Sequence, residues 1–225
     1  MRIASEIVEI FGRPRSYPYV KVCGITNRSD AEGAIRAGAD VLGFNLYSGS
    51  KRYLELSEHQ DWIESLPRQV LRIALLVNPT LDEAFRVLNS DIFDGLQLHG
   101  DESVEFCTTL AERGKPIVKA FRVKAAGIGF ETIEFPVAAI LLDHFSESSY
   151  GGTGQSFDWS LISKMRIHKP LIVAGGLTAQ NVSCAIRMLR PYAVDVSSSV
   201  ESTPRKKEES KIRAFIESVR ATSVC

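Results

Sequence analysis

The chain has 225 residues, which suits a single domain and is a common length for one α/β barrel. Its 27 lysines and arginines balance its 27 aspartates and glutamates, so no net charge indicates nucleic acid or a membrane surface as a partner. Its four cysteines and four histidines lie far apart along the chain, which excludes both zinc-ligand spacing and a disulfide framework.

Residues 1–16 stand outside the pattern that the rest of the chain follows. Glu6 and Glu9 interrupt the only apolar run near the N-terminus, so a signal peptide is not predicted. No apolar stretch approaches the ~20 residues that a membrane-spanning helix needs. We therefore predict an N-terminal extension over residues 1–16, a barrel domain over residues 17–225, and a cytoplasmic protein without a membrane partner.

From Tyr19 onward, short apolar runs alternate with segments of helical period. The first run is VKVCGIT, Val20–Thr26, which stops at Gly24 and yields to a polar helix start. Eight runs of this kind predict strands: Val20–Cys23, Val41–Leu46, Val70–Val77, Gly95–Leu98, Pro116–Phe121, Val137–Leu142, Leu171–Ala174 and Ala193–Val196.

The segments between these strands carry apolar residues at helical spacing. Leu81, Ala84, Phe85 and Leu88 are the clearest case, and the stretch from the fifth strand to Phe135 is the weakest. Strict alternation of strands and helices predicts a parallel sheet, and eight strands close a (β/α)8 TIM barrel. An open doubly wound sheet is the main alternative, but it gives no reason for eight nearly equal units.

Active sites of such barrels form from the residues that directly follow each strand. Cys23 ends the first strand, His99 follows the fourth and Asp143 ends the sixth. Each also has a structural interpretation: a small core hydrophobe for Cys23, a satisfied structural histidine for His99 and a turn aspartate for Asp143. Cys23 and Asp143 lie on well-separated strands, so they can face each other across the barrel mouth as a base and an acid.

The loops between strands and helices indicate an anionic ligand. Arg52 lies in the loop after the second strand, where a guanidinium can bind a carboxylate through two parallel hydrogen bonds. A long loop follows the sixth strand, from Asp143 to about Phe157, and contains Gly151-Gly152-Thr153-Gly154, which is typical of a covering lid. Gly175-Gly176 and Ser197-Ser198-Ser199 follow the last two strands, where barrels often bind phosphate. We therefore predict a phosphorylated small-molecule substrate.

Taken together, these motifs resemble the phosphoribosylanthranilate isomerase family from Val20 to about Val219. The segments that carry the resemblance occur in the family's order: VKVCGIT, GFNLYSGSKRY, LQLHGDE, LLDHF, YGGTGQSFDW, AGGLTAQNV and AVDVSS. The resemblance implies an Amadori rearrangement of N-(5-phosphoribosyl)anthranilate to 1-(2-carboxyphenylamino)-1-deoxyribulose 5-phosphate in tryptophan biosynthesis. It implies no metal or organic cofactor, and it leaves a monomer or a homodimer open.

The same resemblance implies a role for each matching residue. Cys23 matches the family's general base, Asp143 its general acid and Arg52 the residue that binds the anthranilate carboxylate. His99 and Asp195 fall in family motifs and are assigned supporting roles in the substrate site. The implied phosphate-binding residues are Gly152, Gly154, Gly175, Gly176, Ser198 and Ser199.

The chain departs from the family's pattern at two site positions. Ser199 stands where the family usually has glycine, and serine costs about 1–2 kcal/mol if that position requires a positive φ. We expect weaker phosphate binding in that case, rather than lost chemistry. His144 follows the proposed acid where a small residue is expected, and it is a candidate for shifting the pKa of Asp143.

Two other functions are alternatives for a barrel with these motifs. A related isomerase of broader range would also accept the aminoaldose of histidine biosynthesis, but those enzymes use an aspartate at the end of the first strand, where this chain has Cys23. A catalytically silent paralogue would bind the ligand without converting it. Intact Cys23, Asp143 and Arg52 argue against that alternative, and Ser199 is its only support.

Overall fold

The computed structural model describes residues 15–123, 132–133, 135–144, 159, 162 and 165–222. Eight parallel strands form a closed barrel: β1 (Tyr19–Cys23), β2 (Val41–Asn45), β3 (Leu71–Leu76), β4 (Gly95–Leu98), β5 (Ile117–Val123), β7 (Ala139–His144), β9 (Leu171–Val173) and β10 (Ala193–Val196). Each strand pairs with its neighbours in chain order, and β10 closes the ring against β1. The predicted barrel is confirmed, because an open sheet would leave β1 and β10 unpaired with each other.

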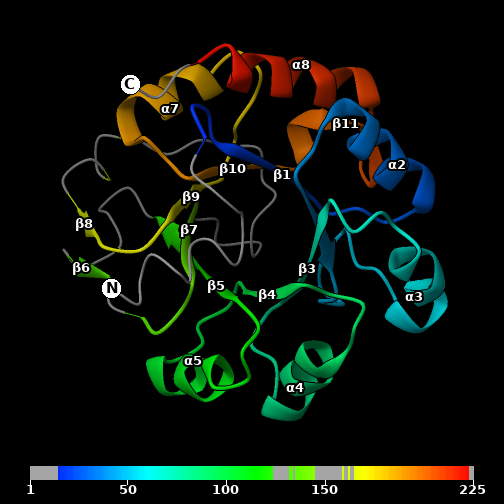
Figure 1. Ribbon diagram of the computed structural model, residues 1–225, viewed down its shortest axis with the longest axis vertical. Coiled ribbons are helices and arrows are strands. Elements are labelled where there is room, and N and C mark those ends of the chain that lie inside the picture. The colour runs from blue at the N-terminus through cyan, green and yellow to red at the C-terminus, as the bar shows by residue number, and fades with distance from the viewer. Residues whose placement is uncertain are drawn as a thin grey trace.

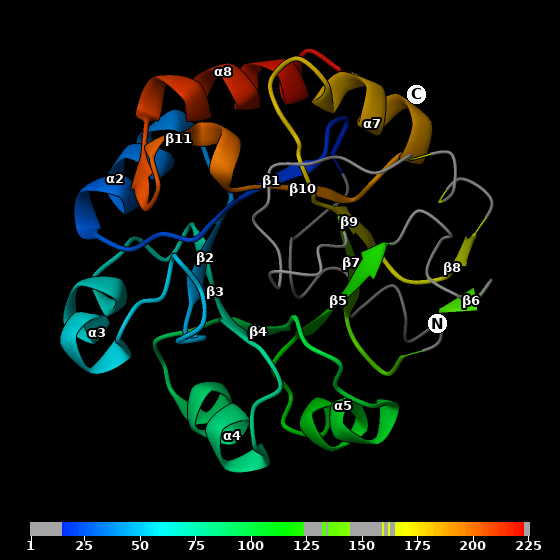
Figure 2. The ribbon, with the colours of Figure 1, turned by 180° about the vertical axis from the view of Figure 1, so that it is seen from behind.

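Within the described residues, six α-helices surround this barrel: α2 (Arg28–Ala37), α3 (Leu56–Glu64), α4 (Leu81–Asn89), α5 (Val104–Ala111), α7 (Val182–Leu189) and α8 (Glu209–Arg220) (Figures 1 and 2). Local signals fix their ends. The side chain of Asn27 caps α2, and Gly38 ends it with a φ of 99°. Thr80 and Glu83 form a capping box at the start of α4.

Three short elements complete the described fold. The 3₁₀ helix η1 (Ser198–Val200) follows β10 and leads into an antiparallel hairpin, β11 (Glu201–Thr203) with β12 (Lys206–Lys207). A second small sheet pairs β6 (Thr132–Ile133) with β8 (Arg166–Ile167). The sequence did not predict η1 or the hairpin, because segments of two or three residues have no hydrophobic period. Residues 1–14 of the predicted extension lie outside the described part of the chain.

Apolar side chains form two clusters on opposite sides of the barrel wall. The larger cluster fills the space between strands and helices and contains Val20 and Val22 of β1 and Cys107 of α5. The smaller cluster lies inside the barrel and contains Tyr19 of β1 and Leu141 of β7. Side chains therefore alternate between the two sides along each strand, which sets which polar residues point inward.

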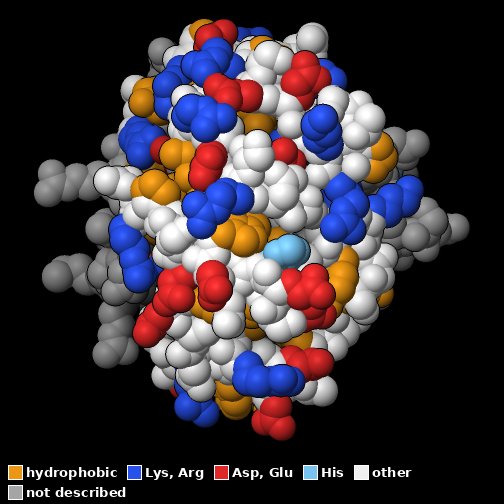
Figure 3. Space-filling model, turned by 90° about the vertical axis from the view of Figure 1, so that its right-hand side faces the viewer, with side chains coloured by type: hydrophobic (Ala, Val, Ile, Leu, Met, Phe, Trp, Pro, Cys, Tyr) orange, Lys and Arg blue, Asp and Glu red, His pale blue; other side chains and the backbone are white. Residues whose placement is uncertain are grey.

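Acidic and basic side chains are interspersed over the face of the molecule that Figure 3 shows. This mixture agrees with the equal numbers of acidic and basic residues in the sequence. Among the helices of the described residues, none combines the length and the apolar character that crossing a membrane requires.

Candidate functional site

The carboxyl ends of the barrel strands surround one cavity. The predicted site residues that line it are Cys23, Arg52, His99, Asp143, Gly175, Gly176, Asp195, Ser198 and Ser199. Gly152 and Gly154 of the predicted covering loop lie outside the described residues. Residues that are up to 176 positions apart in the sequence thus share a single cavity, because parallel strands all end at the same edge of the barrel.

Cys23 lies beside a buried ion pair on the barrel's inner surface. Lys21 precedes it by two residues on β1 and so points to the same side of the strand. The ammonium of Lys21 is 3.1 Å from both carboxylate oxygens of Asp195, its register partner on β10. Gly43 of β2 leaves room for this group, since a Cβ there would lie 2.8 Å from Lys21 Nζ and 2.9 Å from Cys23 Sγ.

These neighbours act on the Cys23 thiol in opposite directions. Burial raises the pKa of Cys23, Lys21 lowers it through its charge and a hydrogen bond, and Asp195 raises it again. The balance leaves the pKa of Cys23 above its ordinary value. The pKa of Lys21 is also raised, because the attraction of Asp195 and of Cys23 outweighs the effect of burial, so Lys21 stays cationic beside the thiol.

We expect the thiol pKa to move in opposite directions in two single variants. Lys21→Met removes the charge that favours the thiolate and raises the pKa of Cys23; Asp195→Asn removes a charge that opposes the thiolate and lowers it. The measurement is the rate of iodoacetamide labelling at the Cys23 peptide against pH, in a Cys184→Ser background because Cys184 is exposed. Shifts of the same sign in both variants would contradict this account.

Asp143 is the last residue but one of β7, and both of its carboxylate oxygens have contacts. Its Oδ1 accepts a hydrogen bond of 2.7 Å from the backbone N–H of His144, and its Oδ2 lies 3.3 Å from Nε2 of His99. The amide nitrogen of Gln97 lies 2.9 Å from Nδ1 of His99, the ring nitrogen that does not face Asp143. Gln97 therefore fixes the orientation of the ring that contacts the carboxyl group.

The ends of β9 and β10 form a concave backbone surface next to the cavity. Gly175 and Gly176 have φ angles of 78° and 63°. A Cβ at Gly175 would lie 2.5 Å from the backbone nitrogen of His144 and 2.9 Å from Asp143 Oδ1, so only glycine fits there. Ser198, the first residue of η1, lines the same cavity as these glycines, and the first backbone N–H groups of a helix have no partner within it, an arrangement that suits an anion.

The backbone of Ser199 does not have the positive φ that would strain a serine at a position where the family usually has glycine. Among the described non-glycine residues, positive φ angles occur only at Asn78, Arg190 and Arg205. The Ser199 hydroxyl donates a hydrogen bond of 2.5 Å to the carbonyl of Leu177, which ties the loop after β10 to the loop after β9. The expected strain cost therefore does not apply to Ser199.

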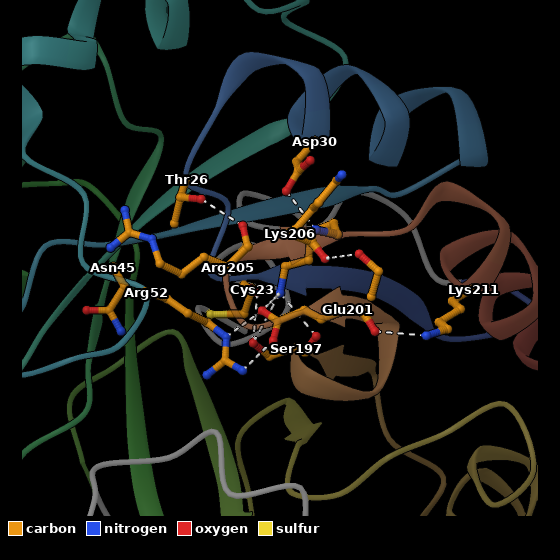
Figure 4. Close-up of polar contacts among 12 residues, drawn as sticks. Cys23, Thr26, Asp30, Asn45, Arg52, Ser197, Glu201, Arg205, Lys206 and Lys211 are labelled. Carbon is orange, nitrogen blue, oxygen red and sulfur yellow. Dashed lines mark hydrogen bonds and ion pairs between the residues drawn. The ribbon is translucent and has the colours of Figure 1, made fainter.

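Arg52 lines the cavity, but its guanidinium already has a carboxylate partner. Its Nε and Nη2 each lie 2.7 Å from an oxygen of Glu201 on β11, and Lys207 Nζ on β12 lies 3.0 Å from Oε1 of the same carboxylate (Figure 4). Glu201 and Lys207 were missed by the sequence reasoning, since residues 201–211 carry seven charges and look like a solvated segment. Gln97 was also missed, although it lies two residues from the predicted site residue His99 and so faces the same side of its strand.

Within the described residues, no three or more histidine, cysteine, aspartate or glutamate side chains form a group that could hold a metal ion. One cavity is instead lined by a thiol, a carboxyl group, a guanidinium and the backbone of Gly175, Gly176, Ser198 and Ser199. Such a set can move two protons on a small anionic ligand.

Comparisons with known proteins agree on one family. The model of the N-(5′-phosphoribosyl)anthranilate isomerase family matches residues 20–218. A relative named N-(5′-phosphoribosyl)anthranilate isomerase, from Pseudomonas fluorescens, is 45% identical over 202 residues, which are 89% of this chain and 97% of that protein.

Solved structures show the same similarity. A phosphoribosyl anthranilate isomerase in complex with reduced 1-(o-carboxyphenylamino)-1-deoxyribulose 5-phosphate is 36% identical, with a TM-score of 0.76 over 91% of this chain and 99% of that one. Monomers generated from the dimeric phosphoribosylanthranilate isomerase of Thermotoga maritima are 35% identical, with a TM-score of 0.75 over the same shares of the two chains.

Proposed function

Since the chain belongs to the N-(5′-phosphoribosyl)anthranilate isomerase family, an enzyme family of tryptophan biosynthesis, we propose how its residues carry out the isomerisation. The substrate is N-(5-phosphoribosyl)anthranilate, and the product is 1-(2-carboxyphenylamino)-1-deoxyribulose 5-phosphate. The reaction opens the furanose ring and removes a proton from C2′ without an external oxidant or reductant, so it needs one group that donates a proton and one that removes a proton on different atoms of the sugar.

Asp143 is the proposed general acid. In its protonated form it gives its proton to the furanose ring oxygen, the C1′–O bond breaks and the nitrogen lone pair forms a C1′=N bond, which gives an iminium ion. Nε2 of His99 lies 3.3 Å from Oδ2 of Asp143, and the backbone N–H of His144 donates to the other oxygen, so the carboxyl group is held in place at the cavity. His99 thus supports the acid by positioning it.

Cys23 is the proposed general base. Its thiolate removes the C2′ proton, the electron pair of that bond moves toward the iminium carbon and nitrogen, and the resulting enolamine tautomerises to the ketone. Lys21 favours the thiolate, and the Lys21–Asp195 ion pair holds the ammonium in place beside it. Asp195 thereby has a supporting role, although its own charge opposes that of the thiolate.

The two anionic groups of the substrate have separate binding places in this proposal. Arg52 binds the anthranilate carboxylate, and the backbone around Gly175, Gly176, Ser198 and Ser199 binds the phosphate. Gly152 and Gly154 are proposed to complete the phosphate site from the covering loop. The single observation that carries the proposal is the shared cavity, which brings Cys23, Asp143, Arg52 and the backbone anion site together.

Three broader assignments are part of the proposal. Residues 1–16 form an extension of a single catalytic domain over residues 17–225, the protein acts in the cytoplasm, and it is a monomer or a homodimer. Support for the last point comes from the neighbouring structures, one of which derives from a dimeric isomerase.

The direct test is turnover of freshly prepared N-(5-phosphoribosyl)anthranilate, followed as the loss of its anthranilate fluorescence. We expect conversion of this substrate and no conversion of the aminoaldose of histidine biosynthesis. Binding of the reduced product analogue, measured by calorimetry, shows separately whether the site is formed. Binding without turnover would show that the protein is a silent paralogue and not an isomerase. The support for that alternative was the backbone strain expected at Ser199, and Ser199 does not have a positive φ.

A further inference from the structure

Arg52 shares its guanidinium between the cavity and a carboxylate outside it. The side chain lines the cavity, yet its Nε and Nη2 each donate a 2.7 Å hydrogen bond to Glu201, which does not line the cavity (Figure 4). The two side chains are 12% and 6% exposed, so this pair is shielded from water and its geometry is a fork of two parallel bonds.

A guanidinium has five N–H groups along its planar edge. Glu201 uses the Nε hydrogen and one Nη2 hydrogen, which leaves the second Nη2 hydrogen and both Nη1 hydrogens. The Nη1 and Nη2 hydrogens together form the end-on fork, which is a second place for two parallel bonds to a carboxylate. We propose that Glu201 is a positioning residue that holds Arg52 by its side edge, so that the end-on fork receives the carboxylate of the substrate.

The hairpin that carries Glu201 is itself fixed to the site. Lys207 Nζ contacts the backbone carbonyl of Ser197 at 3.0 Å as well as Glu201, and its backbone N–H donates to Asp30 at 2.7 Å. Thr26 donates to the carbonyl of Arg205 at 3.0 Å (Figure 4). The loop after β1 and the end of β10 therefore both hold the hairpin, and Glu201 has a defined place behind Arg52.

The charges in this group favour an ionised Glu201. Burial acts to raise the pKa of Glu201, but the hydrogen bond from Arg52 and the charge of Lys207 outweigh it, so the pKa stays below its ordinary value. Burial lowers the pKa of Lys207, although the charge of Glu201 opposes this effect. The hydrogen bond to Glu201 raises the pKa of Arg52, so the guanidinium keeps its charge at the cavity and can receive a ligand carboxylate.

The stem of Arg52 also connects this group to the proposed base. Gly24 follows Cys23, and a Cβ at Gly24 would clash with Cδ of Arg52, so the stem lies directly over the end of β1. Holding the guanidinium therefore sets the distance between the bound carboxylate and the Cys23 end of the cavity. This inference rests on the proposed function, because it assumes a substrate that carries a carboxylate.

The test measures equilibrium binding of two ligands by calorimetry, without turnover. One is reduced 1-(o-carboxyphenylamino)-1-deoxyribulose 5-phosphate, and the other is the same compound without its carboxyl group. We expect Glu201→Gln to weaken binding of the first ligand by about 10- to 100-fold, the range for a lost charge-assisted fork, and to leave the second unchanged. Glu209→Gln is the matched control, since Glu209 pairs with Arg36 on the surface and both ligands should bind it as they bind wild type.

A second variant covers the case in which Glu201→Gln folds poorly. Glu201→Gln with Lys207→Met removes one negative and one positive charge, so the net charge of the group is kept, and we expect the same loss for the carboxylated ligand alone. Equal weakening of both ligands, or weakening of neither, would overturn the inference. Tighter binding of the carboxylated ligand would also overturn it, since Glu201 would then be a competitor for Arg52. If the wild-type protein binds neither ligand, the proposed function itself is wrong.

Discussion

Replacing Cys23 by alanine is expected to lower kcat for N-(5-phosphoribosyl)anthranilate by about 10²- to 10⁴-fold, the range for loss of a general base. The thiol is the only group on β1 that faces the cavity next to the Lys21–Asp195 pair. Alanine keeps the backbone and removes only the sulfur, so affinity for the reduced product analogue should change little. The measurements are steady-state kinetics and calorimetry on the same preparation.

The control for this variant is Cys184→Ser, because Cys184 is an exposed thiol on α7, away from the cavity. Its kcat should equal that of wild type. Substrate deuterated at C2′ gives a second readout, since Cys23→Ser should make proton removal from C2′ the slowest step and increase the isotope effect on kcat. A Cys23→Ala enzyme that keeps a third or more of its kcat would show that another group is the base.

Asp143→Asn is expected to lower kcat by a similar factor of about 10²- to 10⁴-fold, through loss of the general acid. An asparagine side-chain oxygen can still accept the hydrogen bond from the His144 N–H, so the local structure is retained. It cannot deliver a proton to the furanose ring oxygen. Steady-state kinetics of this variant test the role of Asp143, with Asp82→Asn, an exposed aspartate in the first turn of α4, as the matched control.

The deuterium experiment separates this role from that of Cys23. In Asp143→Asn, ring opening becomes the slowest step and precedes the removal of the C2′ proton, so the isotope effect on kcat should fall toward unity. Replacing Cys23 and replacing Asp143 should thus lower kcat by similar factors. The isotope effect on kcat should rise in Cys23→Ser and fall in Asp143→Asn. An isotope effect that rises in Asp143→Asn would reverse the assignment, with Asp143 then acting on the C2′ proton.

The order and type of the barrel strands were predictable because both depend on short-range patterns. The run Val20–Cys23 is apolar, β-branched and ended by glycine, and β1 was found at Tyr19–Cys23. The residues that directly follow the strands were predictable for the same reason. Once the strands are parallel and form a ring, Cys23, His99 and Asp143 must lie at one end of it, whatever the details of packing.

Which side chain contacts which was decided only by the tertiary structure. Lys21 meets Asp195, and Arg52 meets Glu201, across 174 and 149 positions of the sequence. Such pairs depend on the register of β1 against β10 and on the path of the β11–β12 hairpin, neither of which has a local signature. Strand period gives the direction of a side chain, but not the residue that it faces across the ring.

Ser199 shows the same division at a single residue. The sequence raised the question of a positive φ at this position, and the answer depended on η1, which closes the turn with an ordinary backbone. For this protein, then, the sequence by itself determined the barrel and the residues at its mouth, because hydrophobic period and chain order are local properties. The tertiary structure decided how those residues are charged, paired and oriented, because these properties arise only where distant strands and loops come into contact.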